Sequence, residues 1–292
     1  TCALPIYTFF GNLTQKLDTI LITGSNGKSL TTHFTTRLLK EEGLNVGALF
    51  SPHILTYNER IIINNEIISN KLFTDIGNEV LTAVKTLNLE PYSRDVLTIM
   101  GLLFFKEQNI DVALLEATDV YGADPVMLCK PKIVAITRIT DFDQTEKGAV
   151  LLEKALKHML NGLTSKNHVI SADQSKINLQ IMQKVTEGHH AIWAMPIRKL
   201  ASLPYPFEQL HGRSAALAER IAHIYVNNFL RLDTTVVSKS ILVKQKGQRG
   251  RPTLEAKRQA ELNPRRTIDQ FWKDAVTGSR SEERRVGKEC RS

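Results

Sequence analysis

Short apolar runs alternate with longer segments of helical periodicity along most of the chain. Runs rich in aliphatic and β-branched residues cover 19–23, 45–50, 111–116, 132–137, 168–171 and 190–194. The segments between and after them predict helices over 30–42, 71–86, 95–107, 147–160, 175–186 and 215–229. Strands that alternate with helices in this way form parallel βαβ units. The pattern therefore predicts an α/β fold with a mostly parallel sheet and helices on both faces.

Two local features refine this pattern. The β-branched runs of 61–68 flank Asn64-Asn65, which indicates a hairpin. Ser69 is the expected N-cap of the helix over 71–86. The apolar residues of that helix at helical spacing are Leu72, Ile76, Val80, Leu81 and Val84. The polar, proline-containing segment 51–60 is predicted to be a loop.

The first predicted strand and helix enclose a glycine-rich turn, Gly24-Ser25-Asn26-Gly27-Lys28-Ser29. Strand, glycine-rich turn and helix are the context of a phosphate-binding loop, in which backbone N–H groups and the helix N-terminus face an anion. Lys28 would then reach the β- and γ-phosphates, and the Ser29 hydroxyl would bind Mg²⁺. The full Walker spacing is not met because Ile22 stands where the first glycine would be. The alternative is an ordinary strand-to-helix turn with a chance lysine.

Four candidate residues directly follow predicted strands: Gly24, Ser51, Glu116 and Asp143, the last close to Asp141. The carboxyl ends of parallel strands meet at one edge of the sheet, where ligands of open α/β folds bind. Glu116 supplies the hard oxygen that Mg²⁺ prefers. Alternatively, it is a solvated strand end.

Composition restricts the classes of partner. The net charge of +8 is concentrated from residue 244 onward, where 14 Lys/Arg stand against 7 Asp/Glu, a net of +7, which leaves +1 for the first 243 residues. We therefore expect no nucleic-acid binding by the body of the protein. The three scattered cysteines favour a reducing, cytoplasmic environment. The most apolar stretch, 96–105, is about half the length of a membrane span, so we expect no membrane partner.

We expect three regions along the chain. Residues 8–243 form an ATP-binding domain, and 244–278 form a basic linker, with a short helix over 267–273, toward an absent C-terminal domain. Residues 1–7 and 279–292 have no apolar period that ties them to a fold, and we interpret both as non-native ends. A disordered native tail is the alternative.

Two motifs in order resemble known sequences. Gly24-Ser-Asn-Gly-Lys-Ser29 is similar to the GTNGK loop of the Mur ligase superfamily. Phe50-Ser-Pro-His-Ile54, Asn58-Glu-Arg-Ile61 and Asn65-Glu-Ile-Ile-Ser69 resemble the SPH(L), ERI and NGEPIS elements of the folylpolyglutamate synthase/dihydrofolate synthase family. The resemblance covers about residues 17–230 and weakens beyond about 120.

The resemblance implies a Mur-ligase-type central ATPase domain with ATP and Mg²⁺ as cofactors. The implied reaction adds L-glutamate to a folate or dihydropteroate carboxylate through an acyl phosphate. The sequence does not determine the oligomeric state, and a monomer is our expectation. By the same resemblance, Lys28 and the backbone of 24–28 hold phosphates, and Glu116 binds Mg²⁺. Ser51 and His53 lie in the loop beside nucleotide and folate, and Lys154 matches a lysine that the family carbamylates to bind a second Mg²⁺.

The chain departs from the family pattern in three places. Ser29 and Leu30 stand where the family has glycine followed by serine or threonine, and the glycine-rich segment after Glu116 is shortened to 117–124. Gln144 stands where the family has a histidine near the second metal, so we include Gln144 as a metal ligand through its carbonyl oxygen. Three alternatives remain open: a Mur-type ligase for a peptidoglycan precursor or another amino-acid polymer, a nucleotide-binding module without catalysis, and nucleic-acid binding by the basic tail.

Overall fold

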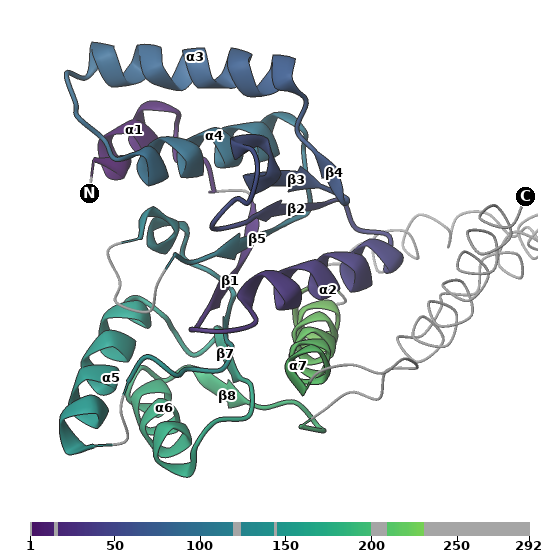
Figure 1. The fold of residues 1–292 in the computed structure, drawn as a ribbon, viewed down its shortest axis with the longest axis vertical. Coiled ribbons are helices and arrows are strands. Elements are labelled where there is room, and N and C mark those ends of the chain that lie inside the picture. Colours follow the sequence, from purple (N-terminus) through teal and green to yellow (C-terminus); the bar gives the residue numbers. More distant parts are fainter. Residues whose placement is uncertain (1, 15–16, 119–123, 143–144, 200–208, 231–292) are drawn as a thin grey trace, which may run out of the picture. The chain divides into compact units, whose positions relative to one another are not determined.

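The computed structural model describes residues 2–14, 17–118, 124–142, 145–199 and 209–230 (Figure 1). The chain divides into two units, 1–221 and 222–292, and only 222–230 of the second are described. The predicted linker over 244–278, its helix over 267–273, and the segment 279–292 lie outside the described residues. The sheet and the candidate site belong to the first unit.

An eight-stranded sheet is the centre of the first unit, with the order β4-β3-β2-β5-β1-β6-β7-β8. Its strands are β1 Asp18–Thr23, β2 Val46–Leu49, β3 Ile61–Ile63, β4 Glu66–Ile67, β5 Val112–Glu116, β6 Ile133–Ile136, β7 His168–Ser171 and β8 Ile192–Ala194. All pairs are parallel except β2 with β3 and β3 with β4. The mostly parallel sheet predicted from the apolar runs is therefore confirmed.

Helices cover both faces of this sheet (Figure 1). They are α1 Ala3–Phe9, α2 Lys28–Glu41, α3 Asn70–Thr86, α4 Ser93–Glu107, α5 Glu146–Met159, α6 Lys176–Gly188 and α7 Gln209–Tyr225, with short 3₁₀ turns η1 Tyr57–Arg60 and η2 Pro125–Cys129. The last helix runs into a π-helical turn, Val226–Leu230. None of the described helices is both long and apolar enough to cross a membrane.

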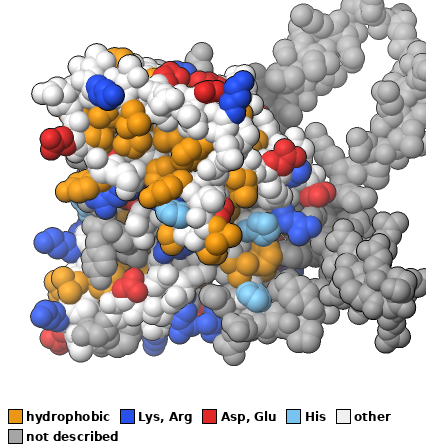
Figure 2. All heavy atoms as spheres, turned by 45° about the horizontal axis from the view of Figure 1, so that its top comes forward, with side chains coloured by type: hydrophobic (Ala, Val, Ile, Leu, Met, Phe, Trp, Pro, Cys, Tyr) orange, Lys and Arg blue, Asp and Glu red, His pale blue; other side chains and the backbone are white. Residues whose placement is uncertain are grey.

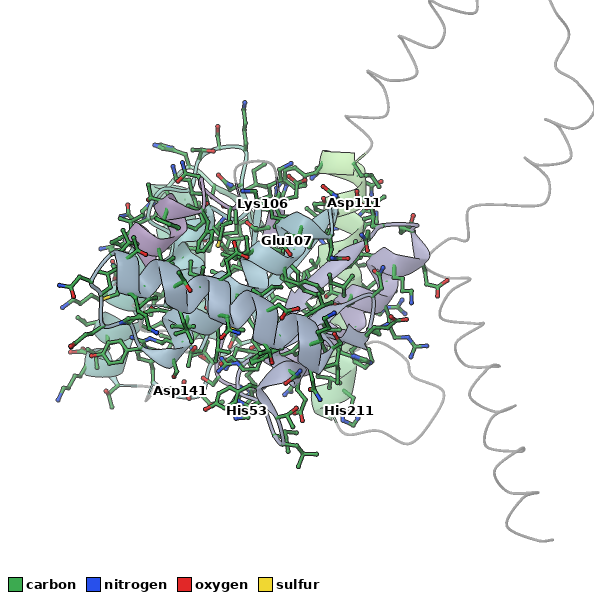
Figure 3. The ribbon with its side chains drawn as sticks, turned by 90° about the horizontal axis from the view of Figure 1, so that it is seen from above. His53, Lys106, Glu107, Asp111, Asp141 and His211 are labelled. Atoms are coloured by element: carbon green, nitrogen blue, oxygen red, sulfur yellow. The ribbon has the colours of Figure 1, made fainter. Side chains whose placement is uncertain are left out.

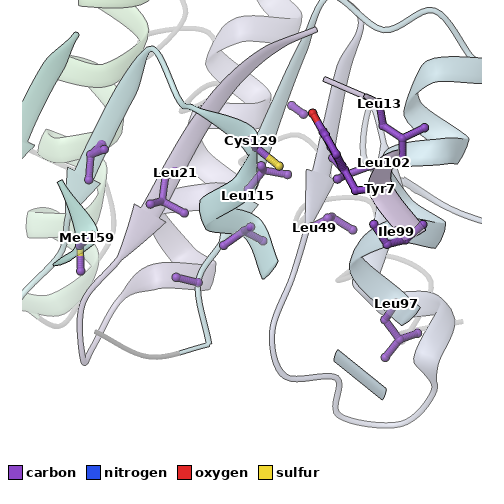
Figure 4. Close-up of a cluster of buried hydrophobic side chains, with 14 of the residues drawn as sticks. Tyr7, Leu13, Leu21, Leu49, Leu97, Ile99, Leu102, Leu115, Cys129 and Met159 are labelled. Atoms are coloured by element: carbon purple, nitrogen blue, oxygen red, sulfur yellow. The ribbon is translucent and has the colours of Figure 1, made fainter. Parts of the chain in front are cut away.

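Alternate strand residues build two apolar layers. On one face, Leu21, Leu49 and Leu115 pack in the cluster that includes Ile99 and Leu102 of α4 (Figure 4). On the other face, neighbouring strand residues such as Ile20, Ile22 and Leu114 are fully buried, and α2 contacts β1, β2 and β5 with Leu38 and Leu39 buried. Because side chains alternate across a strand, burial on both faces explains the continuous apolar runs.

The hairpin and the N-cap are as predicted. Asn64 and Asn65 have positive φ values of 52° and 70°, the conformation that a tight two-residue hairpin turn requires. The Ser69 hydroxyl accepts a hydrogen bond from the Leu72 N–H at the start of α3. The predicted apolar face of α3 is only partly buried, since Leu72 and Leu81 are exposed.

Helix α1 contains most of residues 1–7, the segment that we interpreted as a non-native end. Ala3 and Ile6 are fully buried, and α1 packs against α3 and α4. These residues are therefore tied to the core, although the segment is too short to show a periodicity. The interpretation of 1–7 as non-native stays a prediction.

Candidate functional site

The strand order brings the candidate residues to one edge of the sheet. β1 and β5 are neighbours in the sheet. The chain runs from β1 to β2 in one direction along the sheet and from β5 to β6 in the other, the arrangement that opens a crevice at the carboxyl ends of parallel strands. Figure 3 shows His53 and Asp141, which follow β2 and β6, on one side of the view, and Asp111, which precedes β5, on the other.

Two glycines shape the turn between β1 and α2. Gly24 and Gly27 have φ values of 126° and 91°, in the region that side chains disfavour. At Gly24 a Cβ atom would also overlap the hydroxyl of Thr137, which follows β6. Gly27 is the N-cap of α2. Both positions therefore need glycine because φ is positive. Gly24 needs it also because a side chain there would have no room beside Thr137.

The free N–H groups of the turn lie at its second half. The amides of Ser25 and Asn26 donate to the Arg138 carbonyl, at 3.0 and 3.1 Å. The first hydrogen bond of the helical type runs from the Thr31 N–H to the Gly27 carbonyl, so the N–H groups of residues 28–30 precede the helical ladder. We expected the backbone N–H groups of Gly24 to Lys28 to face the phosphates. The N–H groups of Ser25 and Asn26 already donate to the neighbouring loop, so the donors that remain for an anion lie at the N-terminus of α2.

The Lys28 side chain folds back over the turn. Its Nζ donates to the Gly24 carbonyl at 2.7 Å and approaches the Ser25 carbonyl at 3.5 Å. The ammonium group therefore lies above the loop, next to the free N–H groups of the helix N-terminus. A positive charge beside unpaired donors is an anion-binding arrangement.

Ser29 and Glu116 meet across the crevice. Glu116 ends β5 beside Ile22 of β1, and the Ser29 Oγ donates to its Oε1 at 2.8 Å. Glu116 is only 3% exposed, and its Oε2 has no hydrogen-bonding partner among the described residues. Burial raises the pKa of Glu116 to about 7, against the opposing effects of Ser29, Lys28, the Ser51 N–H and Arg60.

This pair fits a divalent cation. A hydroxyl and a carboxylate are both hard oxygen ligands, and the unpaired Oε2 would gain a partner from the metal. Among the described residues, no group of three His, Cys, Asp or Glu could hold a metal ion by itself. A cation here would therefore draw its remaining ligands from phosphate and water, as Mg²⁺ does in nucleotide sites.

The loop after β2 supports this centre. Arg60 donates through Nη2 to the Ser51 Oγ at 2.9 Å, and the Ser51 hydroxyl lies 3.5 Å from that of Thr118. The His53 ring packs on Tyr57 with centroids 4.3 Å apart. Ser51 is thus joined to the Glu116 group, whereas His53 packs within its own loop.

A pocket of about 310 Å³, including the solvent at its mouth, lies beside Glu116. Its polar lining comes from the ends of several elements: Arg60, Arg94, Thr98, Glu116, Thr118 and Asp124. Sequence reasoning missed Arg94, Thr98, Thr118 and Asp124 as site residues. Asp124 lies in the shortened segment after Glu116, but no sequence pattern links α4 to this edge.

Of the remaining expected residues, the structure describes Lys154 and Asp141. Lys154 lies on α5 with an exposed side chain and has no hydrogen bond or ion pair recorded among the described residues, so its role stays a prediction. Asp143 and Gln144 lie outside the described residues. Asp141 is described and exposed.

Comparisons with known proteins agree on one family. No protein-family model matches the chain. It is 30% identical over 207 residues to a dihydrofolate synthase/folylpolyglutamate synthase of Bacillus subtilis, a match that covers 69% of this chain and 44% of that protein. The chain thus spans less than half the length of this relative.

Solved structures share the fold. The structure of Mycobacterium tuberculosis folylpolyglutamate synthase with ADP gives a TM-score of 0.64 at 17% identity, over 77% of this chain and 57% of that one. An FPGS-AMPPCP-folate complex gives 0.67 at 20% identity, over 77% and 62%. At these identities the likeness shows the fold.

Proposed function

We propose that this chain, which belongs to the folylpolyglutamate synthase/dihydrofolate synthase family, carries the ATP-binding domain of an ATP-dependent ligase. The ligase adds L-glutamate to a folate or dihydropteroate carboxylate. The single observation that carries the proposal is the hydrogen bond from Ser29 to the buried Glu116, directly below the glycine turn. In this proposal, residues 8–243 are the ATP-binding domain and the protein acts as a monomer in the cytoplasm.

The site divides the tasks of nucleotide binding. The N–H groups of residues 28–30 and the Lys28 ammonium would hold the phosphates of ATP. Ser29 and Glu116 would hold Mg²⁺, which neutralises charge on the transferring phosphoryl group when bound. Lys154 and Gln144 would serve a second cation.

The chemistry needs such a site because a carboxylate is a poor electrophile. Its oxygen attacks the γ-phosphorus of ATP, the bond to ADP breaks, and an acyl phosphate forms. The glutamate amine then attacks the acyl carbon, and phosphate leaves with the electron pair of the broken C–O bond. Lys28 would stabilise the first step, because its charge would lie beside the phosphoryl group on which negative charge develops.

The relatives support the substrates. Folylpolyglutamate synthases have been solved in complex with ADP and with AMPPCP and folate, and the loop of Ser51 and His53 lies at the same edge of the sheet as the nucleotide turn. A peptidoglycan-type acceptor stays an alternative because the phosphate site alone does not select the acceptor. A binding module without catalysis stays a second alternative because the segment after Glu116 is short.

The test combines binding and turnover. Calorimetry should show AMPPCP binding that requires Mg²⁺, that Lys28→Ala and Ser29→Ala weaken about 10-fold or more, and that Lys85→Ala at the exposed end of α3 leaves unchanged. Labelled glutamate should then enter folate or dihydropteroate with ATP. Incorporation into a UDP-muramyl acceptor alone would support the peptidoglycan alternative, and Mg²⁺-dependent binding without incorporation into any acceptor would support the module.

A further inference from the structure

The pocket beside Glu116 contains one charged side chain with no hydrogen bond to the described protein. Glu116, Arg60 and Asp124 all have partners: the Ser29 hydroxyl, the Phe50 carbonyl and Ser51 hydroxyl, and the backbone N–H groups of 118 and 126, respectively. Arg94 has none, and its Nε is buried. Within the part of the chain that the structure describes, its guanidinium packs on the Tyr92 ring, with Cζ 5.4 Å from the ring centroid.

Arg94 also stands where a helix disfavours a cation. It is the second residue of α4, in the first turn, where the positive end of the helix dipole opposes a positive side chain. The buried Nε–H of Arg94 has lost its hydrogen bonds to water without gaining one to the described protein, which costs further free energy of folding. Local rules are broken in this way mainly at functional sites.

The pocket places this unpaired cation next to the reaction centre. Arg94 and Thr98, one helical turn apart on α4, line the same pocket as Glu116. The pocket is open to solvent at its mouth, so one end of an acceptor can reach its polar lining from outside. The planar guanidinium group can donate two parallel hydrogen bonds to the two oxygens of a carboxylate. The other arginine of the pocket, Arg60, already donates to the protein.

We infer that Arg94 binds a second carboxylate of the acceptor, and so selects acceptors that end in glutamate over those with a single carboxylate. This inference rests on the proposed function. Folate ends in a glutamate whose α- and γ-carboxylates lie a few bonds apart. One can be phosphorylated near Glu116 while the other is held by Arg94. Dihydropteroate ends in one aromatic carboxylate, which cannot occupy both places.

The test measures the affinity of the 292-residue chain for folate and for pteroate, the same compound without glutamate, with Mg²⁺ and AMPPCP present. The wild type should bind folate about 10- to 100-fold more tightly. Arg94→Gln should remove this preference and leave pteroate binding unchanged, and Arg94→Lys should restore only part of it. Arg37→Gln, an exposed arginine on α2, is the matched control and should change neither affinity.

Two results would overturn the inference. Equal binding of folate and pteroate by the wild type would do so, as would an Arg94→Gln variant that loses both affinities in parallel. Both results leave the proposed function standing, because an acceptor still binds the wild type. If neither compound binds the wild type while AMPPCP does, the proposed function itself fails, and the inference with it.

Discussion

Replacement of Glu116 by Gln should stabilise the protein at high pH while it removes the cation site. The carboxyl group is buried, and its pKa is raised from 4.5 to about 7. A carboxyl whose pKa is higher in the folded than in the unfolded state favours folding when protonated. That contribution is complete below pH 4.5, and it is lost as the pH rises to about 7.

The size of the effect follows from the pKa difference. Between pH 5 and pH 8 the wild type should lose about 2 to 3 kcal/mol of unfolding free energy through this group. The glutamine of Glu116→Gln does not titrate, so the variant does not lose this free energy. Its unfolding free energy relative to the wild type should therefore rise by about 2 to 3 kcal/mol between pH 5 and pH 8. The difference between the two pH values cancels any packing or hydrogen-bonding penalty that the amide introduces.

Urea unfolding at pH 5 and pH 8, with a chelator present, measures this difference. The control is Glu66→Gln on β4, an exposed glutamate whose replacement should give the same relative stability at both pH values. If Glu116→Gln behaved like this control, the carboxyl group would not be held in an unfavourable charged state, and our electrostatic account of the site would be wrong. Binding of Mg²⁺–AMPPCP should fall in the same variant at every pH.

Three further changes test other features. Gly24→Ala should destabilise the fold by about 2 kcal/mol or more, because φ is positive and the new Cβ overlaps Thr137, and thermal unfolding would measure this. Ile6→Ala should cost about 2 to 5 kcal/mol in urea unfolding because the side chain is fully buried, whereas Ile54→Ala, 89% exposed, should change little; equal effects would contradict the packing of α1. Removal of residues 244–292 should leave nucleotide affinity unchanged and abolish DNA binding in a filter assay, so a shortened chain that still binds DNA tightly would contradict the charge distribution.

The sequence predicted the features that local chemistry determines. Apolar runs covered on both faces predicted the parallel strands, and Asn64-Asn65 and Ser69 predicted a turn and a cap. Gly24 and Glu116 were predicted to meet because both follow strands of one parallel sheet. In each case a short segment contains the whole signal.

Features made by tertiary packing were not predictable in this way. Helix α1 contains too few residues for a period, so its burial was missed. Arg94 reaches the pocket only because α4 packs on the sheet beside β2. A single sequence does not show that these two elements, far apart along the chain, lie next to each other. The occupation of the Ser25 and Asn26 amides likewise depends on Arg138, more than a hundred residues away.

That contact joins the nucleotide turn to the chain that follows β6. Asn26 pairs with Arg138 in an isolated bridge, and its side chain donates to the Thr140 hydroxyl. Hydrogen bonds therefore hold the two loops together. Under the proposed function, a shift of the turn on phosphate binding would be passed through these bonds to the segment that leads to Asp141.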